Sequence, residues 1–334
     1  MTKVLLTGGS SFIGAHILEI LLLSVLQLIY NVVLAVRTES KGQEILNAYP
    51  KSNELSYVVT GNFSKLGVFD NALQSDPPFD AVIHSASPFH FRSTDHKKDI
   101  LEPAINGIVG ILKAIKQHAP SAKKVVITSS MATVMKPFSA PVKYTAEDWN
   151  PVTEEQALSN SGLAYLGSKI FAERSAWEFI KKELPSVGLA TINPPAVLGP
   201  VIHHLKSLAD INTSNAVIAD LMQGKWKNGA PLTFTKLWVD VRDVALAYVN
   251  ALEIPEAVGR RFLLNGGYVT NADYVAIAKK NPLLKDKLPE TVDKEEITDP
   301  EVDIELAKEI LDIKFRSLEE SITDTITSLQ RFVE

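Results

Sequence analysis

The chain has 334 residues, 46% of them hydrophobic and 22% charged, which is enough to bury a sizeable core in one large or two interleaved domains. Its formal net charge of -5 and isoelectric point near 5.9 argue against a nucleic-acid-binding protein, which would carry a basic patch. The lack of cysteine excludes disulfides, a thiolate nucleophile and a cysteine-ligated zinc site, and it agrees with a cytoplasmic location.

The N-terminal segment predicts the nucleotide-binding start of a doubly wound parallel sheet. Residues 3–7 are typical of a short buried strand, and the glycine-rich stretch from Gly8 to Gly14 leads directly into an apolar helix over about residues 13–25. In such a turn, backbone N–H groups can approach a pyrophosphate, and the helix N-terminus adds positive dipole. Gly14 would permit close packing of the helix against the strand. The alternative is an ordinary glycine turn.

An unusually apolar stretch runs from Ile17 to Val36, with only Glu19 charged, so its length would also suit a membrane span. Gln27 and Asn31 interrupt the stretch, and a strand and a glycine turn precede it. These features favour a helix, a short link and a buried parallel strand over residues 32–36.

Two cations follow this second strand. The end of the second strand is where an acidic side chain binds the ribose hydroxyl of NAD, and where an arginine accommodates the 2′-phosphate of NADP. Arg37 and Lys41 stand at this point, with Glu39 as the one acidic residue between them. The pattern favours a 2′-phosphate, and a solvated basic turn is the alternative.

Strands and helices continue to alternate as far as Pro200, which is the α/β pattern. Beyond Pro200 the periodicity loosens, the segment from Trp238 to Ala245 is expected to cap a helix, and the charged end predicts surface loops and an amphipathic helix. Further strands are expected over residues 56–60, 81–84, 125–130 and 189–192, with a long helix over about 95–118. The strand at 125–130 ends in hydroxyl side chains, which should face a site because ligands of open α/β sheets bind at the carboxyl ends of the strands.

Tyr165 and Lys169 lie four residues apart in a segment with helical spacing of apolar residues, so both should share one helix face. An ammonium beside a phenol stabilises the phenolate and lowers the phenol pKa, which would suit proton transfer at neutral pH. The spacing is weak evidence alone, because eight tyrosines give about one chance match.

Several segments occur together in an order that is far more specific than this spacing. With them the chain resembles the extended short-chain dehydrogenase/reductase family, and within it the yeast NADPH-dependent methylglyoxal, aldehyde and ketone (carbonyl) reductases, which are related to dihydroflavonol reductases. The segments are His84–Phe89, Pro103–Gly107, Thr128–Ser130, Glu147–Pro151 and Ala172–Trp177.

The resemblance implies a Rossmann-type α/β fold with a smaller, interleaved C-terminal substrate domain. We expect residues 1–194 and about 236–255 to form the NADPH-binding domain, and about 195–235 and 256–334 the substrate-binding domain. It also implies reduction of aldehydes and ketones by hydride transfer, with Ser130, Tyr165 and Lys169 as the catalytic residues and Ser129 as the neighbouring candidate for the serine.

By the same resemblance, two sets of residues should line the site. Ser11 stands where the family has a glycine, and Asn62 where it has an aspartate near the adenine. The expected NADPH-binding residues are Thr7, Gly8, Ser10, Ser11, Phe12, Ile13, Gly14, Arg37, Lys41, Asn62, Phe63, Ala86, Ser87, Tyr165, Lys169, Pro194 and Val197. The expected substrate pocket comprises Phe89, Met131, Met135, Gly162 and Ala196, none of them charged, which favours uncharged carbonyl compounds, bulky ketones included.

Two other functions share this fold. A sugar-nucleotide epimerase or dehydratase would have to hold a second diphosphate, for which the C-terminal region offers only scattered lysines. A non-catalytic NADP-binding sensor would usually have lost the tyrosine or the lysine. We expect no metal site, since the one histidine pair is adjacent and points apart on a helix, and we expect a monomer or homodimer that acts on a small carbonyl compound without nucleic-acid or membrane partners.

Overall fold

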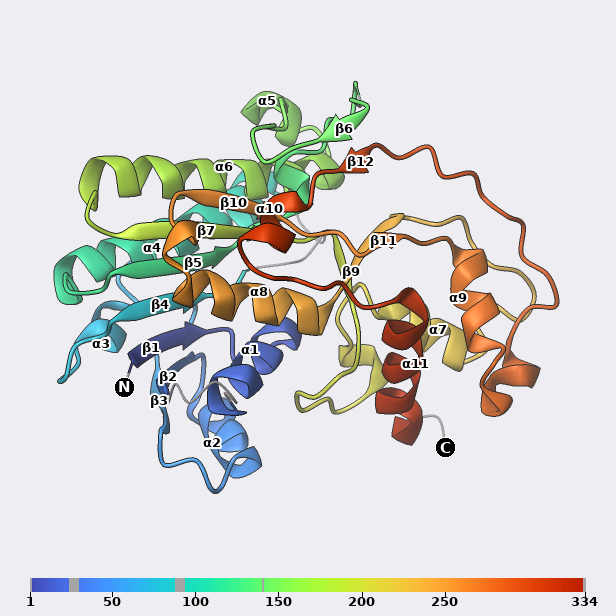
Figure 1. The fold of residues 1–334 in the computed structure, drawn as a ribbon, viewed down its shortest axis with the longest axis horizontal. Coiled ribbons are helices and arrows are strands. Elements are labelled where there is room, and N and C mark those ends of the chain that lie inside the picture. The colour runs from blue at the N-terminus through green and yellow to red at the C-terminus, as the bar shows by residue number, and fades with distance from the viewer. Residues whose placement is uncertain (1, 24–29, 88–93, 140, 333–334) are drawn as a thin grey trace.

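The computed structural model describes residues 2–23, 30–87, 94–139 and 141–332. Its centre is a seven-stranded parallel sheet in the order β10-β7-β5-β4-β1-β2-β3, which confirms the expected Rossmann-type sheet (Figure 1). The chain moves outward from β1 in one direction through β2 and β3 and then in the other through β4, so a topological switch point lies between β1 and β4. The strands are β1 (Thr2–Thr7), β2 (Tyr30–Val36), β3 (Leu55–Val59), β4 (Ala81–His84), β5 (Lys124–Thr128), β7 (Gly188–Asn193) and β10 (Arg260–Leu263).

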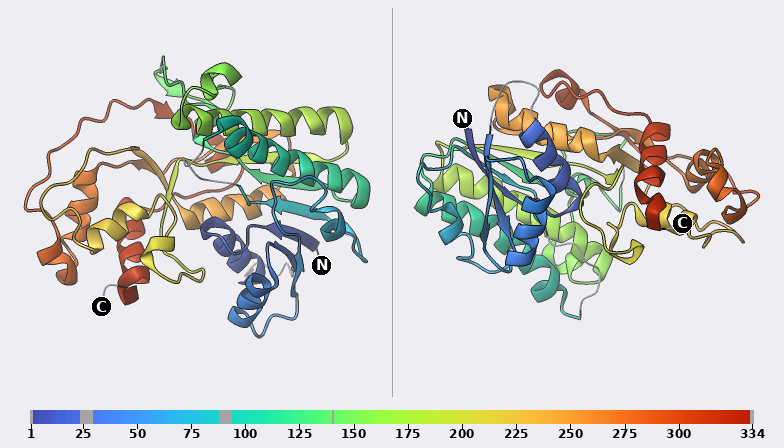
Figure 2. Two further views of the ribbon diagram at one scale, coloured as in Figure 1. Left: turned by 180° about the vertical axis from the view of Figure 1, so that it is seen from behind. Right: turned by 90° about the horizontal axis from the view of Figure 1, so that it is seen from below.

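Helices cover both faces of this sheet (Figures 1 and 2). Successive strand side chains point to opposite faces, so Leu5 and Val125 pack toward α4 and α6, whereas Leu6 and Val126 pack toward α1 and α8. A single π-helical stretch over 97–101 leads into α4, so the expected helix at 95–118 is regular only from Glu102. The helices of this part are α1 (Phe12–Leu23), α2 (Glu39–Ala48), α3 (Asp70–Leu73), α4 (Glu102–His118), α5 (Glu154–Ala157), α6 (Ser161–Glu183) and α8 (Val241–Glu253).

The C-terminal region is less regular and packs against one end of the sheet, where α7, α9 and α11 lie together (Figure 1). One continuous apolar cluster joins α1, α8 and these helices, so the two parts share a core. Its elements are β8 (Ala196–Leu198), β9 (Leu237–Asp240) and β11 (Gly267–Tyr268) in one small sheet, β6 (Lys143–Tyr144) with β12 (Glu301–Val302) in another, and α7 (Ala216–Met222), α9 (Asn271–Ala278), α10 (Glu305–Glu309) and α11 (Leu318–Leu329).

Strand β10 lies in the range expected for the substrate domain, yet it extends the main sheet by pairing with β7. The sequence did not predict this strand, because four residues are too short a segment to be recognised as a strand of the main sheet from their pattern alone. The division into two domains stays a prediction, with β10 moved to the nucleotide-binding part.

The apolar stretch after the first helix forms sheet structure rather than a long helix. Strand β2 pairs in parallel with β1 and β3, and α1 ends at Leu23. Among the described residues, no helix combines the length and hydropathy needed to cross a bilayer. Most of the expected link between α1 and β2 lies outside those residues.

Candidate active site

A cavity of about 620 Å³ opens at the carboxyl ends of the parallel strands, beside the switch point. It is continuous from the N-terminus of α1 to the serine, tyrosine and lysine singled out in the sequence. Of the expected NADPH-binding residues, it is lined by Gly8, Ser10, Ser11, Phe12, Ile13, Arg37, Lys41, Phe63, Ala86, Ser87, Tyr165, Lys169, Pro194 and Val197.

The glycine turn has no room for side chains. Gly8 has a φ of +80°, and a Cβ there would lie 2.6 Å from the Ser85 hydroxyl oxygen. A Cβ on Gly14 would lie 2.0 Å from the Gly8 carbonyl oxygen, so Gly14 packs under the turn rather than lining the cavity. The Ser11 hydroxyl donates to the Gly8 carbonyl at 2.7 Å, so this serine closes the turn at the position where the resemblance implies a glycine. The turn leaves backbone open to a phosphate group.

The catalytic candidates meet at the other end of the cavity. Tyr165 and Lys169 share one face of α6, whose N-terminus is capped by the side chain of Asn160. Ser130 follows β5 and hydrogen-bonds to Tyr165, and its oxygen also accepts the N–H of Ala132 at 3.1 Å. Burial raises the pKa of Tyr165, and the Ser130 hydrogen bond offsets part of that rise.

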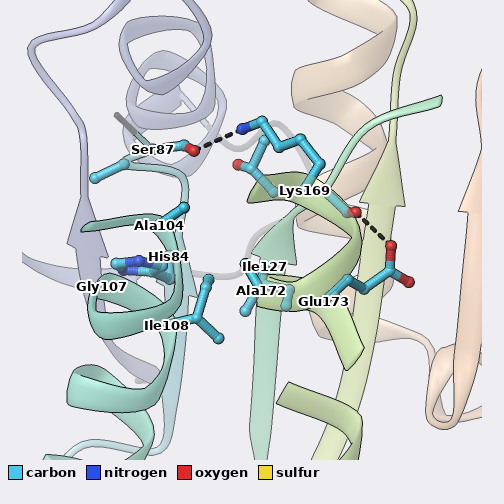
Figure 3. Close-up of a pocket in the computed structure, with 12 residues that line it drawn as sticks. His84, Ser87, Ala104, Gly107, Ile108, Ile127, Lys169, Ala172 and Glu173 are labelled. Atoms are coloured by element: carbon cyan, nitrogen blue, oxygen red, sulfur yellow. Dashed lines mark hydrogen bonds between the residues drawn. The ribbon is translucent and has the colours of Figure 1, made fainter. Parts of the chain in front are cut away.

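Lys169 is buried, and burial lowers its pKa to about 8. Its ammonium donates to the Ser87 hydroxyl at 2.6 Å and lies 5.7 Å from the Tyr165 ring centre (Figure 3). In this structure burial has the largest effect on the Tyr165 pKa and raises it, while the Lys169 ammonium donates to Ser87. The expected lowering of the Tyr165 pKa by Lys169 stays a prediction. The side chain nonetheless stands within the same cavity wall as the phenol.

The structure separates the two serine candidates. Ser129 also lines the cavity, but it is buried and its hydroxyl donates to the carboxylate of Glu173. Ser130 contacts Tyr165. The geometry favours Ser130 as the serine that reaches a substrate.

The far end of the cavity is open to solvent. Arg37 is exposed, and its guanidinium lies 5.8 Å from the ring centre of Phe63. Within the described ranges Arg37 forms no ion pair, whereas the ammonium of Lys41 pairs with Glu44 at 2.9 Å. Two cations at one end and a half-buried phenol at the other fit a phosphorylated dinucleotide lying along the cavity.

Three expected NADPH-binding residues do not line the cavity. Gly14 packs beneath the turn, and Thr7 is fully buried, where its hydroxyl bonds to the Nδ1 atom of His84 at 2.9 Å. The exposed Asn62 accepts the backbone N–H of Ser64 at 3.0 Å, so it shapes a turn. These residues support the lining residues beside them.

The expected substrate pocket stays a prediction, although Met131, Met135, Gly162 and Ala196 are not among the residues that line this cavity. Met131 is 1% exposed and packs with Val134, Tyr144 and Met135 in a separate apolar cluster, because the chain turns inward after Ser130. Ala196 is the first residue of β8 and does not line the cavity, although its neighbours Pro195 and Val197 do. Gly162 is exposed outside the lining set, and Phe89 lies outside the described residues.

Sequence reasoning missed the wall that the C-terminal region supplies. Ile211, Asn212, Thr213 and Ser214 line the cavity, together with Pro195. The Oδ1 atom of Asn212 is buried without a hydrogen-bond partner, which marks it as an acceptor available to a ligand. No signal pointed to this loop, because the sequence beyond Pro200 has no clear period.

The chain is similar over its whole length to proteins with named activities. A family model described as NAD dependent epimerase/dehydratase family matches residues 4–265. The ketoreductase azaE of Aspergillus niger is 43% identical over 98% of this chain and 97% of its own, and the NADPH-dependent methylglyoxal reductase GRE2 of Saccharomyces cerevisiae is 34% identical over 99% and 98%. The crystal structure of Gre2 from Candida albicans in complex with NADPH has a TM-score of 0.90 and 34% identity, with both chains covered completely.

Proposed function

Because the chain belongs to the NAD dependent epimerase/dehydratase family, we propose, from its site and its relatives, that it is an NADPH-dependent reductase of aldehydes and ketones. The observation that carries the proposal is one cavity with Ser130, Tyr165 and Lys169 at its buried end and two cations at its open end. Its relatives named as ketoreductase and methylglyoxal reductase support the same reaction class.

The chain's own groups serve the reaction at the carbonyl oxygen of the substrate. The hydroxyl groups of Ser130 and Tyr165 would donate hydrogen bonds to that oxygen, which stabilises the negative charge that develops on it. Tyr165 would then transfer its proton to the oxygen, completing the alcohol. When bound, NADPH supplies the hydride that the carbonyl carbon receives.

Lys169 would have two roles at this end. As an ammonium it stabilises the phenolate left on Tyr165 after proton transfer, since opposite charges in a buried site interact strongly. It would also hold the ribose next to the nicotinamide. The glycine turn would hold the pyrophosphate, and Arg37 with Lys41 the 2′-phosphate.

The substrate class follows from the residues near Tyr165. Pro194, Pro195, Val197 and Ile211 form an apolar wall, and among the residues that the structure describes Lys169 is the one charged residue that lines this part of the cavity. Such a wall offers nothing to a substrate carboxylate or phosphate, so uncharged carbonyl compounds should be preferred. We propose that bulky ketones are accepted as well as small aldehydes.

A panel of aldehydes and ketones, followed by the loss of NADPH absorbance, tests the proposal. We expect turnover with uncharged ketones and chiral alcohols as products. Turnover only with a nucleotide sugar would indicate an epimerase or dehydratase instead. Binding of NADPH without turnover of any carbonyl compound would indicate a sensor.

We also propose that the enzyme is a cytoplasmic monomer or homodimer. The lack of cysteine agrees with a reducing compartment. Sedimentation of the purified chain would distinguish the two assembly states, and a larger assembly would contradict both.

A further inference from the structure

A buried carboxylate lies one helical turn beyond Lys169. Glu173 on α6 is 2% exposed and pairs with Arg261 of β10, with 2.6 Å between its Oε1 atom and the Nε atom of Arg261. Burial alone would raise the pKa of a carboxyl, but the charge of Arg261 and several hydrogen bonds hold the pKa of Glu173 below its ordinary value. Glu173 is therefore an ionised group in the core, behind the proposed catalytic residues.

The two oxygens of this carboxylate face different parts of the molecule. Oε1 accepts from Arg261, from the indole N–H of Trp177 at 3.1 Å and from Thr191 at 3.2 Å. Oε2 accepts from the hydroxyl of Ser129 and from the side-chain amide of Asn193 at 2.8 Å. Oε1 is thus bound to β10, to β7 and to Trp177 on α6, and Oε2 to the residue that follows β5 and to the end of β7.

The Oε2 side leads directly to Ser130. Ser129 is its neighbour in the chain, and the Asn193 amide also lies 3.4 Å from the Ser130 carbonyl and donates to Thr133 at 3.0 Å. The Thr133 hydroxyl donates to the same Ser130 carbonyl at 2.8 Å. The backbone around Ser130 is therefore held by a hydrogen-bond network that includes the carboxylate of Glu173.

The Arg261 side binds a second segment. The guanidinium donates to the carbonyls of Ala146 and Asp148, at 2.6 and 2.7 Å, and to the hydroxyl of Thr133 at 2.9 Å. It also stacks on Trp149, 3.9 Å from the centre of the ring. Two of the segments that carried the family resemblance, at 147–151 and 172–177, thus meet at one ion pair.

Glu173 does not act as the charge partner of Lys169. Figure 3 shows the Lys169 ammonium directed at Ser87, with the Glu173 carboxylate apart from it. The carboxylate accepts from the hydroxyl of Ser129. A cavity of only about 20 Å³ lies among these residues. The carboxylate binds the strand end, and the ammonium binds the wall of the main cavity.

We propose that Glu173, through Ser129 and Asn193, is a positioning residue that holds Ser130 against Tyr165. The inference rests on the proposed function, since it assigns Glu173 a task within that reaction. Tyr165 and Glu173 are both on α6, and Ser129 and Ser130 both follow β5. The hydrogen bond from Ser129 to Glu173 therefore joins the end of β5, which carries Ser130, to α6, which carries Tyr165. A displacement of about 1 Å between Ser130 and Tyr165 can lower the rate about a hundredfold.

Two variants that each remove one hydrogen bond to Glu173 test the positioning role. Neither leaves Arg261 without its ion-pair partner, as Glu173→Gln would. Ser129→Ala removes one donor from Oε2, and Trp177→Phe removes one from Oε1 and serves as the matched control. We expect Ser129→Ala to lower kcat about tenfold or more, with the KM for NADPH changed less than about twofold. Trp177→Phe should leave both within about twofold, while thermal unfolding shows a comparable loss of stability in the two variants.

Equal kcat values in the two variants, whether both native or both reduced, would overturn the positioning role, since Glu173 would then contribute only stability. Tyr165→Phe is measured in parallel to separate this inference from the function itself. If Tyr165→Phe kept native turnover, the proposed function would be wrong. If it lost turnover while Ser129→Ala behaved as Trp177→Phe, only the positioning role would be wrong.

Discussion

Lys169 and Arg37 are both cations in the wall of one cavity, but their surroundings differ. Lys169 is 7% exposed, and burial lowers its pKa to about 8, whereas Arg37 extends from the end of β2 into solvent. Charges in a buried site interact strongly, and charges in water are screened by solvent and salt. The buried end of the cavity should therefore control the rate of reaction, and the exposed end the choice of cofactor.

The largest effect is expected from Lys169→Ala, because this side chain has two roles at the buried end. We expect kcat to fall by about a hundredfold or more, and the affinity for NADPH to fall as well. Steady-state kinetics with a fluorescence titration of NADPH measures both. A native kcat with a changed affinity alone would contradict the different roles of the two ends, since Lys169 would then act like a residue of the exposed end.

Arg37→Ala should act on cofactor choice alone. A charge-assisted bond to a phosphate contributes roughly 1.5–3 kcal/mol, so the KM for NADPH should rise about ten- to a hundredfold. The KM for NADH, which lacks the 2′-phosphate, and kcat at saturation should change little. Equal increases in KM for the two cofactors would remove Arg37 from this role.

The titration of Lys169 gives a prediction of pH dependence. With its pKa lowered to about 8 by burial, Lys169 is charged below that pH and neutral above it. The kcat/KM for NADPH, which reports on the free enzyme, should thus fall about fivefold from pH 8 to pH 9, as the protonated fraction of Lys169 falls from about one half to about one tenth. A flat profile across this range in the wild type would show that the charge of Lys169 is not needed.

Lys41→Ala should have the smallest effect. Its ammonium is already paired with Glu44 on the exposed surface of α2, and such pairs and contacts are weakened by water. We expect a rise in the KM for NADPH of only a few-fold, which shrinks further as salt is added. An effect as large as that of Arg37→Ala would mean that the ion pair with Glu44 does not weaken the contact of Lys41 with the 2′-phosphate.

Local patterns predicted the sheet well, because parallel strands are short apolar runs and the turn after β1 needs Gly8. Contacts between distant segments could not be predicted. Arg261 lies 88 residues from Glu173, and the strand that carries it has no pattern of its own. Met131 is buried where the chain turns inward, and Asn212 reaches the cavity on a loop. Both positions depend on packing between distant segments, which the local sequence pattern does not predict.

The most direct test is a single measurement on Tyr165→Phe, which removes the proposed proton donor and leaves the ring in place. We compare its turnover of a ketone with its affinity for NADPH, the latter from titration without substrate. We expect kcat to fall by orders of magnitude, while the Kd for NADPH stays within about twofold of the wild-type value. Near-native turnover would contradict the role of Tyr165, because its phenol would then not supply the proton.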